Sequence, residues 1–381
     1  MSLQGLKAVF CFPALHFGGA ERQGLHFCRY LRDFEGVEVE VWGFLEGDGV
    51  RERCAAWQIP CRLVPFKLGK NRAEIIFALW RLGYELRKTH ADLILPYVDY
   101  PNLAVCSAWR WTKARFCWWQ QRNAGFHRGP IWLRKKAVKT TPAFIANSTP
   151  GLDFLTSQLG LPKSRCHFIP NGIEDPQPLI TRREWRDRLG LQNQDFLVTM
   201  VANLTATKDH STLLKAWKQV LSNGLVGNPP VLALAGRFGD AEKEIKALAH
   251  DLELGKSVRF LGAVDDVDGL LSASDLCAFS SQAEGCPNGV LEAMAAGLPV
   301  VATDIPGVRD ALGSNATQFL APIGDPLVLA QKIQLMIDNP GLRQEQGKKN
   351  RARVKNEFSI EKMCQSSVGL IKAHIQQRNS K

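Results

Sequence analysis

The sequence predicts an α/β protein with two doubly wound parallel sheets, and three observations support this fold class. Short β-rich runs alternate with helical patterns along most of the 381 residues. The alternation pauses once, in the turn-rich stretch 171–178, and it restarts after Asp195. Strand–helix alternation is typical of a parallel sheet covered by helices on both faces. We therefore expect two Rossmann-like domains that face a cleft.

The first series of elements defines an N-terminal domain at residues 1–172. Helical spacing occupies 22–34 and 74–88, among other segments between the expected strands. Strands are expected at 8–12, 37–44, 63–66, 93–98, 116–119, 144–146 and 166–169.

The second series defines a C-terminal domain at residues 173–357. Each of its expected strands is followed by a helical pattern, and Ser359 is a suitable N-cap for a last helix. We expect that helix, within residues 358–381, to cross back and pack towards the N-terminal domain. The strands of the second series are expected at 196–201, 231–235, 258–261, 276–279 and 299–302.

The net charge of +11 is confined to the first half of the chain. Residues 1–172 hold 24 Lys and Arg against 13 Asp and Glu, whereas residues 173–381 hold 24 of each. The segment 102–152 has no acidic residue, and its cations are interleaved with tryptophans at 109, 111, 118, 119 and 132. Basic charge with Trp predicts a peripheral contact of segment 109–139 with an anionic membrane. The alternative is that the tryptophans are core residues and the cations a solvated face.

Other features of the composition predict the compartment. No apolar run approaches the roughly 18 residues of a membrane-spanning helix, and residues 1–13 lack the pattern of a signal peptide. The ten cysteines are scattered singly without a CxxC pair, which favours reduced, inert thiols rather than a disulfide framework or a zinc site. We expect a cytoplasmic protein, located at the inner face of the membrane if the basic segment binds lipid.

The strongest chemical signal lies at residues 280–299. An expected strand enters a loop containing Gly285, Cys286 and Pro287, and a helix is expected to begin near Asn288. A helix N-terminus at the carboxyl edge of a parallel sheet offers backbone N–H groups and partial positive charge to a phosphate. Carboxylates accept strong hydrogen bonds from sugar hydroxyls, so acids beside such a site suit a sugar–diphosphate ligand. The candidate acids are Glu284 in the loop and Glu292 in the helix.

At these residues the sequence closely resembles the retaining GT-B glycosyltransferases of family 4. Their hallmark is a Glu, seven residues and a second Glu within E-G-x-P-N-x-x-x-E-A-M-A-x-G-x-P-V-V-A, and the match runs from Glu284 to Ala302. The resemblance extends through the segments 18–21, 170–173 and 260–262. It implies that Glu284 contacts the donor sugar, that Glu292 contacts the ribose, and that the glycines at 18 and 19 approach the phosphates.

The resemblance also assigns Lys208 to the donor phosphates, where a cation would stabilise the departing diphosphate. The chain departs from the family pattern at Asn203, where a second cation is common, and Arg237 is the candidate to compensate. A His that the family often places in the N-terminal domain is missing from segment 118–123, so His16, beside the glycine loop, is the candidate catalytic group there. The predicted catalytic residues are His16, Lys208 and Glu284; the predicted donor-binding residues are Gly18, Gly19, Asn203, Lys208, Arg237, Glu284, Gly285, Cys286, Pro287, Asn288 and Glu292.

Two weaker motifs carry no function in this interpretation. Asp266-Val267-Asp268 has the spelling of a metal–diphosphate motif, but it stands at an apparent helix start, where acids favour the helix dipole. No GxGxxG follows the first expected strand, and the phosphate-loop GKS/T pattern is absent. We expect no metal or other cofactor to be required.

The predicted reaction is transfer of a sugar from a nucleotide diphosphate sugar to a hydroxyl of a glycan or lipid-linked acceptor, with retention of configuration. The resemblance favours UDP as the nucleotide and bacterial surface polysaccharide or lipopolysaccharide assembly as the setting. A nucleotide-sugar epimerase on the same fold is one alternative. A non-catalytic, basic nucleic-acid-binding protein is the other; because it leaves the second half of the chain unexplained, we expect no nucleic-acid partner.

Overall fold

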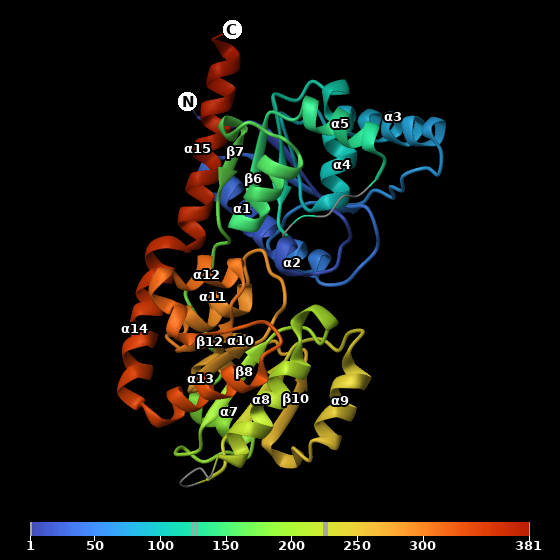
Figure 1. Cartoon of the computed structure of the whole chain (residues 1–381). Helices are drawn as coiled ribbons and strands as arrows, with labels where there is room; N and C mark the ends of the chain where they lie inside the picture. The colour runs from blue at the N-terminus through green and yellow to red at the C-terminus, as the bar shows by residue number, and fades with distance from the viewer. Residues whose placement is uncertain (1, 124, 126–128, 224–227, 381) are drawn as a thin grey trace. The chain divides into compact units, whose positions relative to one another are not determined.

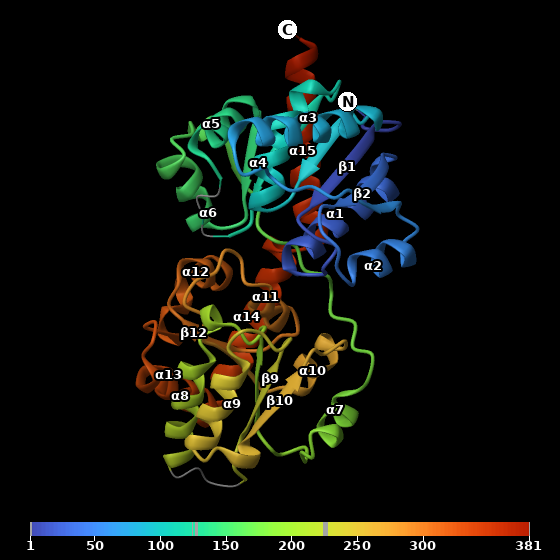
Figure 2. The same ribbon diagram turned by 90° about the vertical axis from the view of Figure 1, so that its right-hand side faces the viewer.

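The computed structural model describes residues 2–123, 125, 129–223 and 228–380, and the chain divides into two compact units. Unit 1 consists of residues 1–172 and 360–381, and unit 2 of residues 173–359. The last helix, α15 (Ile360–Asn379), therefore belongs to unit 1, while Phe358 and Ser359 belong to unit 2. The predicted fold class is confirmed, because each unit holds a parallel sheet with helices on its faces (Figures 1 and 2).

The sheet of unit 1, within the described residues, has seven strands in the order β3-β2-β1-β4-β5-β6-β7. All of its neighbouring strands pair in parallel. The order reverses between β1 and β4, which makes their carboxyl ends the switch point of the sheet. The strands are β1 (Lys7–Phe12), β2 (Glu38–Gly43), β3 (Cys61–Leu63), β4 (Leu93–Pro96), β5 (Phe116–Gln121), β6 (Ala143–Ala146) and β7 (Cys166–Phe168).

The two faces of this sheet are buried in separate cores because side chains alternate along each strand. From β1, Phe10 and Phe12 face one core with α1 (Gly19–Glu35), α2 (Val50–Ala56) and α15. Val9 and Cys11 face the other core, which is formed with α3 (Arg72–Lys88), α4 (Asp99–Ala108) and α5 (Ile131–Thr140). Figure 2 shows α3 and α4 on one side of the sheet and α15 on the other.

The tryptophans of the basic segment are largely core residues. Trp109, Trp118 and Trp119 are buried, so for these three the alternative of core residues is correct and a membrane contact is excluded. Trp111 is exposed and Trp132 partly exposed. Of the cations in segment 109–139, Arg128 lies outside the described residues. A membrane contact through this segment can therefore use only a part of its aromatic side chains.

The sheet of unit 2, again within the described residues, has six strands in the order β10-β9-β8-β11-β12-β13. Here the order reverses between β8 and β11, so these two strands form the switch point. The strands are β8 (Leu197–Val201), β9 (Val231–Ala235), β10 (Val258–Gly262), β11 (Leu276–Phe279), β12 (Val300–Thr303) and β13 (Leu320–Ala321). The helices are α7 (Arg182–Arg188), α8 (His210–Ser222), α9 (Glu242–Asp251), α10 (Val267–Ala273), α11 (Asn288–Ala295), α12 (Pro306–Leu312), α13 (Pro326–Asp338) and α14 (Pro340–Glu357).

Asp266 has a structural role at the start of α10. Its carboxylate accepts the backbone N–H of Gly269 at 2.9 Å, which is an N-cap, and also the indole N–H of Trp185 at 2.8 Å. It further accepts the N–H groups of Leu179 and Ile180, while Asp268 accepts that of Gln177. These bonds hold the start of α10 against the segment that leads into α7. The two acids therefore act as a cap and a clamp, as the capping interpretation predicts.

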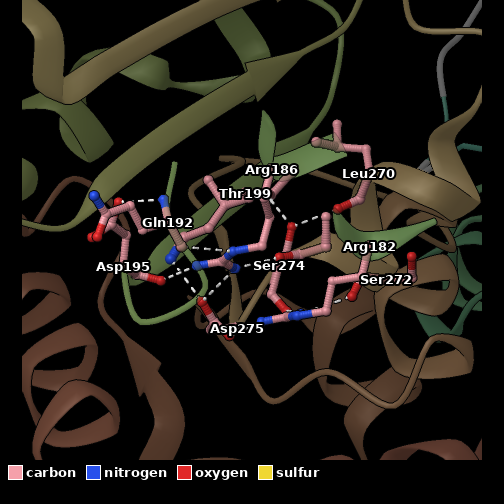
Figure 3. Close-up of polar contacts among 11 residues, drawn as sticks. Arg182, Arg186, Gln192, Asp195, Thr199, Leu270, Ser272, Ser274 and Asp275 are labelled. Atoms are coloured by element: carbon pink, nitrogen blue, oxygen red, sulfur yellow. Dashed lines mark hydrogen bonds and ion pairs between the residues drawn. The ribbon is translucent and has the colours of Figure 1, made fainter. Parts of the chain in front are cut away.

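A buried arginine fixes α7 at the amino end of β8 (Figure 3). Arg186 is 1% exposed, and it donates to the carbonyls of Gln192 at 3.1 Å, Ala273 at 2.8 Å and Asp195. It also pairs with Asp275 at 3.3 Å. This cluster joins α7 to the strands at the edge opposite to the carboxyl ends of the sheet.

Candidate functional site

The candidate site of unit 2 is built on the two loops at its switch point. The loop after β8 contains Asn203 and, in the 3-10 turn η4 (Ala206–Lys208), the predicted phosphate-binding lysine. The loop after β11 contains Glu284 and leads into α11. Parallel sheets bind ligands at a switch point because the loops that follow the two neighbouring strands leave towards opposite faces of the sheet and open a crevice.

Hydrogen bonds join these two loops. Ser280 Oγ donates to the carbonyl of Lys208 at 3.1 Å, and Ser281 Oγ donates to the carbonyl of Thr207 at 3.0 Å. The backbone N–H of Gln282 also donates to the Thr207 carbonyl, at 2.9 Å. The two loops are thereby held as one rigid edge.

Lys208 and Glu284, both predicted as donor-binding residues, form an ion pair across this edge. Their side chains are 25% and 13% exposed, so both are partly shielded from solvent. Lys208 Nζ also lies 5.7 Å from the ring centroid of Phe279, at the end of β11. Partial burial strengthens electrostatic interactions relative to water. The pair thus places one cation and one hydrogen-bond-accepting carboxylate where a charged, hydroxyl-rich ligand would need them.

The N-terminus of α11 lies next to this pair. Its N-cap is Pro287, which provides no side-chain cap, and no acidic residue occurs in its first turn. The helix start is held close to the sheet, because a Cβ on Gly289 would lie 2.3 Å from the carbonyl oxygen of Val201. A helix start without its own anion suits an external one. Of the predicted loop residues, Gly285 and Pro287 are buried, and Cys286 and Asn288 are partly exposed.

Glu292 is a buried acid rather than a surface residue. It is 9% exposed and lies on α11, a helix that packs against β11. Burial, with the Glu292 charge as the second cause, raises the pKa of the Cys277 thiol to about 12. Burying a carboxylate is costly unless it has partners. A buried carboxylate at this edge of the sheet is therefore a better candidate for ligand binding than a carboxylate on the surface.

Asn203 and Arg237 are neighbours, and the Asn203 side chain contacts the backbone of Arg237. Asn203 Oδ1 accepts the backbone N–H of Arg237 at 3.0 Å, and both residues are exposed. Gly236 lies between the loops so tightly that a Cβ there would be 2.1 Å from the carbonyl oxygen of Ala202. The backbone of Arg237, the predicted compensating cation, therefore lies beside Asn203 in the loop after β9.

His210 follows Lys208 closely and is neutral. Burial, followed by the charge of Lys208, lowers the pKa of His210 from 6.5 to about 4. The imidazole is 1% exposed at the start of α8. At neutral pH the cation of this loop is therefore Lys208 and not the histidine.

The lowered pKa of His210 predicts acid sensitivity. Between pH 6.5 and about pH 4, the unfolded chain binds a proton at His210 and the folded chain does not. The free energy of unfolding therefore decreases as the pH falls through this range. The loss at about pH 5 is on the order of 2 kcal/mol. Urea unfolding of His210→Gln at about pH 7 and pH 5 should show a smaller pH effect than the unaltered protein. His250→Gln, at a side chain 91% exposed, is the matched control; an equal pH effect in all three proteins would contradict the assignment.

The predicted residues of the other half lie in unit 1, in the loop after β1. His16 Nδ1 accepts the backbone N–H of Asp48 at 3.4 Å, so the proton of a neutral His16 is on Nε2. Gly18 and Gly19 are exposed at the start of α1, with Gly18 as N-cap.

Two features of unit 1 were not predicted from the sequence. Glu21 lies in the first turn of α1, and burial raises the pKa of its carboxyl group. Its Oε2 would be 2.8 Å from a Cβ placed on Gly18, so an acid already occupies part of the glycine loop. Val98, after β4, has φ +67°, a conformation that strains a β-branched residue. Val98 lies at the switch point of the sheet of unit 1, and packing alone does not explain its strained backbone.

Arg122 is the charged group at the end of β5, in the segment where the family's histidine is missing. Its guanidinium donates to Asn171 Oδ1 at 2.9 Å and lies 5.3 Å from the ring centroid of Tyr97. Asn147 Nδ2 donates to the same Asn171 oxygen at 3.1 Å. The segment after β5, which has no histidine, therefore carries an arginine that is held by the amide oxygen of Asn171.

Across residues 2–123, 125, 129–223 and 228–380, no helix combines the length and apolar character needed to cross a bilayer. In the same residues, no three side chains of His, Cys, Asp or Glu are grouped as metal ligands would be.

Comparison with known proteins connects both units to glycosyltransferases. The family described as "Glycosyl transferases group 1" matches residues 181–353, and the family "Glycosyltransferase Family 4" matches residues 17–176. An Escherichia coli UDP-Gal:alpha-D-GlcNAc-diphosphoundecaprenol alpha-1,3-galactosyltransferase is 28% identical over 198 residues, 51% of each chain. An uncharacterized glycosyltransferase of Haemophilus influenzae is 31% identical over 200 residues, 52% of this chain and 54% of the relative.

Solved structures agree with the fold. The structure of Anabaena HepE in complex with UDP and glucose superimposes with a TM-score of 0.83 at 21% identity, over 97% of this chain and 100% of the other. At this identity the likeness concerns the fold. The alignments with the curated relatives span about half of the length of those proteins.

Proposed function

Because this chain belongs to the group 1 glycosyltransferases of family 4, we propose that it transfers a sugar from a nucleotide diphosphate sugar to an acceptor hydroxyl with retention of configuration. The observation that carries this proposal is the Lys208–Glu284 ion pair at the switch point of unit 2, beside the α11 N-terminus. A cation and a helix start suit a diphosphate, and a carboxylate suits sugar hydroxyls.

The donor is proposed to lie along the carboxyl edge of unit 2. Its diphosphate would be held by Lys208 and by the backbone N–H groups at the start of α11. Glu284 would accept hydrogen bonds from the sugar, and Glu292 from the ribose. UDP is the proposed nucleotide, supported by the names of the E. coli relative and of the HepE complex.

In the proposed reaction, the acceptor oxygen forms a bond to the anomeric carbon while the bond from that carbon to the diphosphate breaks. The acceptor proton passes to an oxygen of the departing diphosphate on the same face of the sugar. Lys208 and the α11 N-terminus stabilise the charge that develops on the leaving group. Positioning and fixed charges then supply the rate enhancement, and we propose that no metal is needed.

The acceptor is proposed to be a glycan or a lipid-linked saccharide of bacterial surface polysaccharide or lipopolysaccharide assembly. The support is the diphosphoundecaprenol-linked substrate in the name of the E. coli relative. The excess positive charge of residues 1–172 suits an anionic acceptor or an anionic membrane. A cytoplasmic protein at the inner face of the membrane is the setting proposed.

Donor binding tests the proposal directly. Calorimetric titration with UDP-, GDP- and ADP-sugars, with and without EDTA, should show metal-independent binding of one nucleotide class, with UDP expected. Glu292→Gln should weaken binding of the tightest-binding donor by roughly 10-fold or more, because a hydrogen bond to a charged group is worth about 1.5–3 kcal/mol.

Two results would contradict the proposal. Glu345→Gln, at an exposed acid on α14, is the matched control and should bind the donor normally. Equal binding by both variants would remove Glu292 from the site, and binding of no nucleotide sugar at all would overturn the enzymatic assignment. Turnover of the donor to an isomer without any acceptor would favour an epimerase instead.

A further inference from the structure

Helix α3 of unit 1 carries apolar side chains on two opposite faces. Its inner face buries Ile75, Leu79, Leu82 and Leu86 in the core. A soluble amphipathic helix normally turns polar residues outward on the opposite face. Here the outer face instead carries four large apolar residues that are about half exposed: Ile76 at 47%, Phe77 at 59%, Trp80 at 55% and Tyr84 at 52%.

The outward aromatic side chains form an ordered stack. Phe77 and Trp80 lie with ring centroids 6.0 Å apart and an interplanar angle of 25°. Trp80 and Tyr84 lie 5.9 Å apart at 14°. The spacing i, i+3 and i+7 places these rings on adjacent turns of one face. A continuous exposed aromatic surface of this kind marks an interaction site, because isolated exposed apolar residues would not stack along a helix.

A fourth aromatic side chain extends this surface beyond α3. Trp111, in the 3-10 turn η1 (Trp109–Trp111), packs where α3 has Gly83; a Cβ there would lie 2.8 Å from Trp111 Cε3. Trp111 is 39% exposed, and Lys136 Nζ of α5 lies 4.3 Å from its ring centroid. The figures place α3, α4 and α5 together on one side of unit 1. We call Phe77, Trp80, Tyr84 and Trp111 the aromatic face.

Cations surround the aromatic face. Arg81 and Arg87 are exposed on α3, and Lys88 Nζ lies 4.3 Å from the ring centroid of Tyr84. Further exposed cations on η1, on the residues after it and on α5 are Arg110, Lys113, Lys135 and Lys139. The two acids of α3 are engaged locally. Glu74 accepts from Asn71 and from the Lys70 N–H, and Glu85 pairs with Lys88 at 3.1 Å.

We propose that the aromatic face of α3 inserts into the interfacial layer of an anionic lipid bilayer. Trp and Tyr prefer this layer because their rings are apolar and their polar atoms remain hydrated. Nearby Lys and Arg side chains add electrostatic attraction to anionic lipids. The charge complementarity selects a bilayer over a second copy of this chain, since two such basic faces would repel one another. The aromatic face belongs to unit 1, whereas the donor site belongs to unit 2.

Vesicle sedimentation tests the aromatic face. The full chain should bind vesicles of equal parts phosphatidylcholine and phosphatidylglycerol, and binding should weaken with added salt and be much weaker to phosphatidylcholine alone. The double variant Phe77→Ser/Trp80→Ser should bind the anionic vesicles at least about tenfold more weakly, because two half-exposed rings no longer enter the bilayer. Phe34→Ser, at a ring 74% exposed on α1 of the same unit, is the matched control and should bind normally.

Fluorescence gives a second, independent measurement. Brominated anionic lipids should quench a part of the tryptophan emission, and Trp80→Phe should remove most of the quenched part. Unchanged vesicle binding by the double variant, or unchanged quenching in Trp80→Phe, would overturn the proposal. Self-association of the unaltered chain that the double variant abolishes would also overturn it in favour of a protein interface. Donor titration is expected to be unchanged in all of these variants, so failure here leaves the transferase assignment intact.

Discussion

Replacing Lys208 by alanine is expected to lower kcat about 10²- to 10³-fold, the usual effect of removing one preorganised group that stabilises transition-state charge. Lys208 is the partly shielded cation at the switch point of unit 2. Its charge is needed most when the diphosphate departs, so kcat should fall more than KM rises. Steady-state kinetics with the donor identified by titration measure both parameters.

A merely structural role for Lys208 would give a different pattern. Lys208→Ala leaves Glu284 without its partner, so a loss of folding stability must be separated from a loss of chemistry. Partial recovery of kcat by added methylammonium, together with a normal unfolding transition, would assign the loss to the missing charge. Lys215→Ala, at an exposed lysine of α8, should have normal activity. A decrease of less than about tenfold in Lys208→Ala would remove the residue from leaving-group stabilisation.

The strands were predictable because their residues bury both faces of a parallel sheet. The run 276–279 is β11 without any change, and the run 231–235 is β9. The prediction at 63–66 was displaced, since β3 is Cys61–Leu63 and pairs at the edge with β2. The two-residue strand β13 was missed because Leu320 and Ala321 carry no periodic pattern, and only pairing with β12 defines them.

The site was predictable in its parts but not in its contacts. Lys208 and Glu284 were identified from the family resemblance, whereas the loops that carry their ion pair are joined by hydrogen bonds of Ser280 and Ser281 across 72 and 74 residues of chain. The position of Glu21 inside the glycine loop likewise results from packing. Sequence spacing cannot show which of two neighbouring loops a side chain meets.

The surface was the least predictable feature. Tryptophans next to cations suggested an exposed segment, yet Trp118 faces the core from β5 and Trp109 is also buried. On α3, in contrast, apolar residues occur on two opposite faces, and the pattern alone cannot distinguish the face that packs from the face that Trp80 occupies. Tertiary contacts with α4 decide this, and they are not encoded in the local spacing.

The second large effect is expected for Arg186→Met, which should lower the unfolding free energy of unit 2 by about 3–5 kcal/mol, because three backbone carbonyls lose a buried donor at about 1–3 kcal/mol each. The carbonyls of Ala273 and Asp195 would lose their donor, and methionine cannot replace it (Figure 3). Asp275 would keep Arg182 at 2.6 Å and the Leu197 N–H at 2.8 Å, so its charge stays partly compensated.

Urea unfolding followed by hydrogen exchange of unit 2 measures this loss without assuming a two-state transition for the whole chain. Arg182→Met is the matched control, because Arg182 is 44% exposed and pairs with the same aspartate, so its loss should cost no more than about 1 kcal/mol. Near-equal losses in the two variants would show that the carboxylate, and not the burial of Arg186, holds α7. Since the cluster lies at the amino end of β8 and Lys208 follows the carboxyl end, folded Arg186→Met should still bind the donor. Loss of donor binding by a variant that remains folded would instead couple the two ends of the sheet.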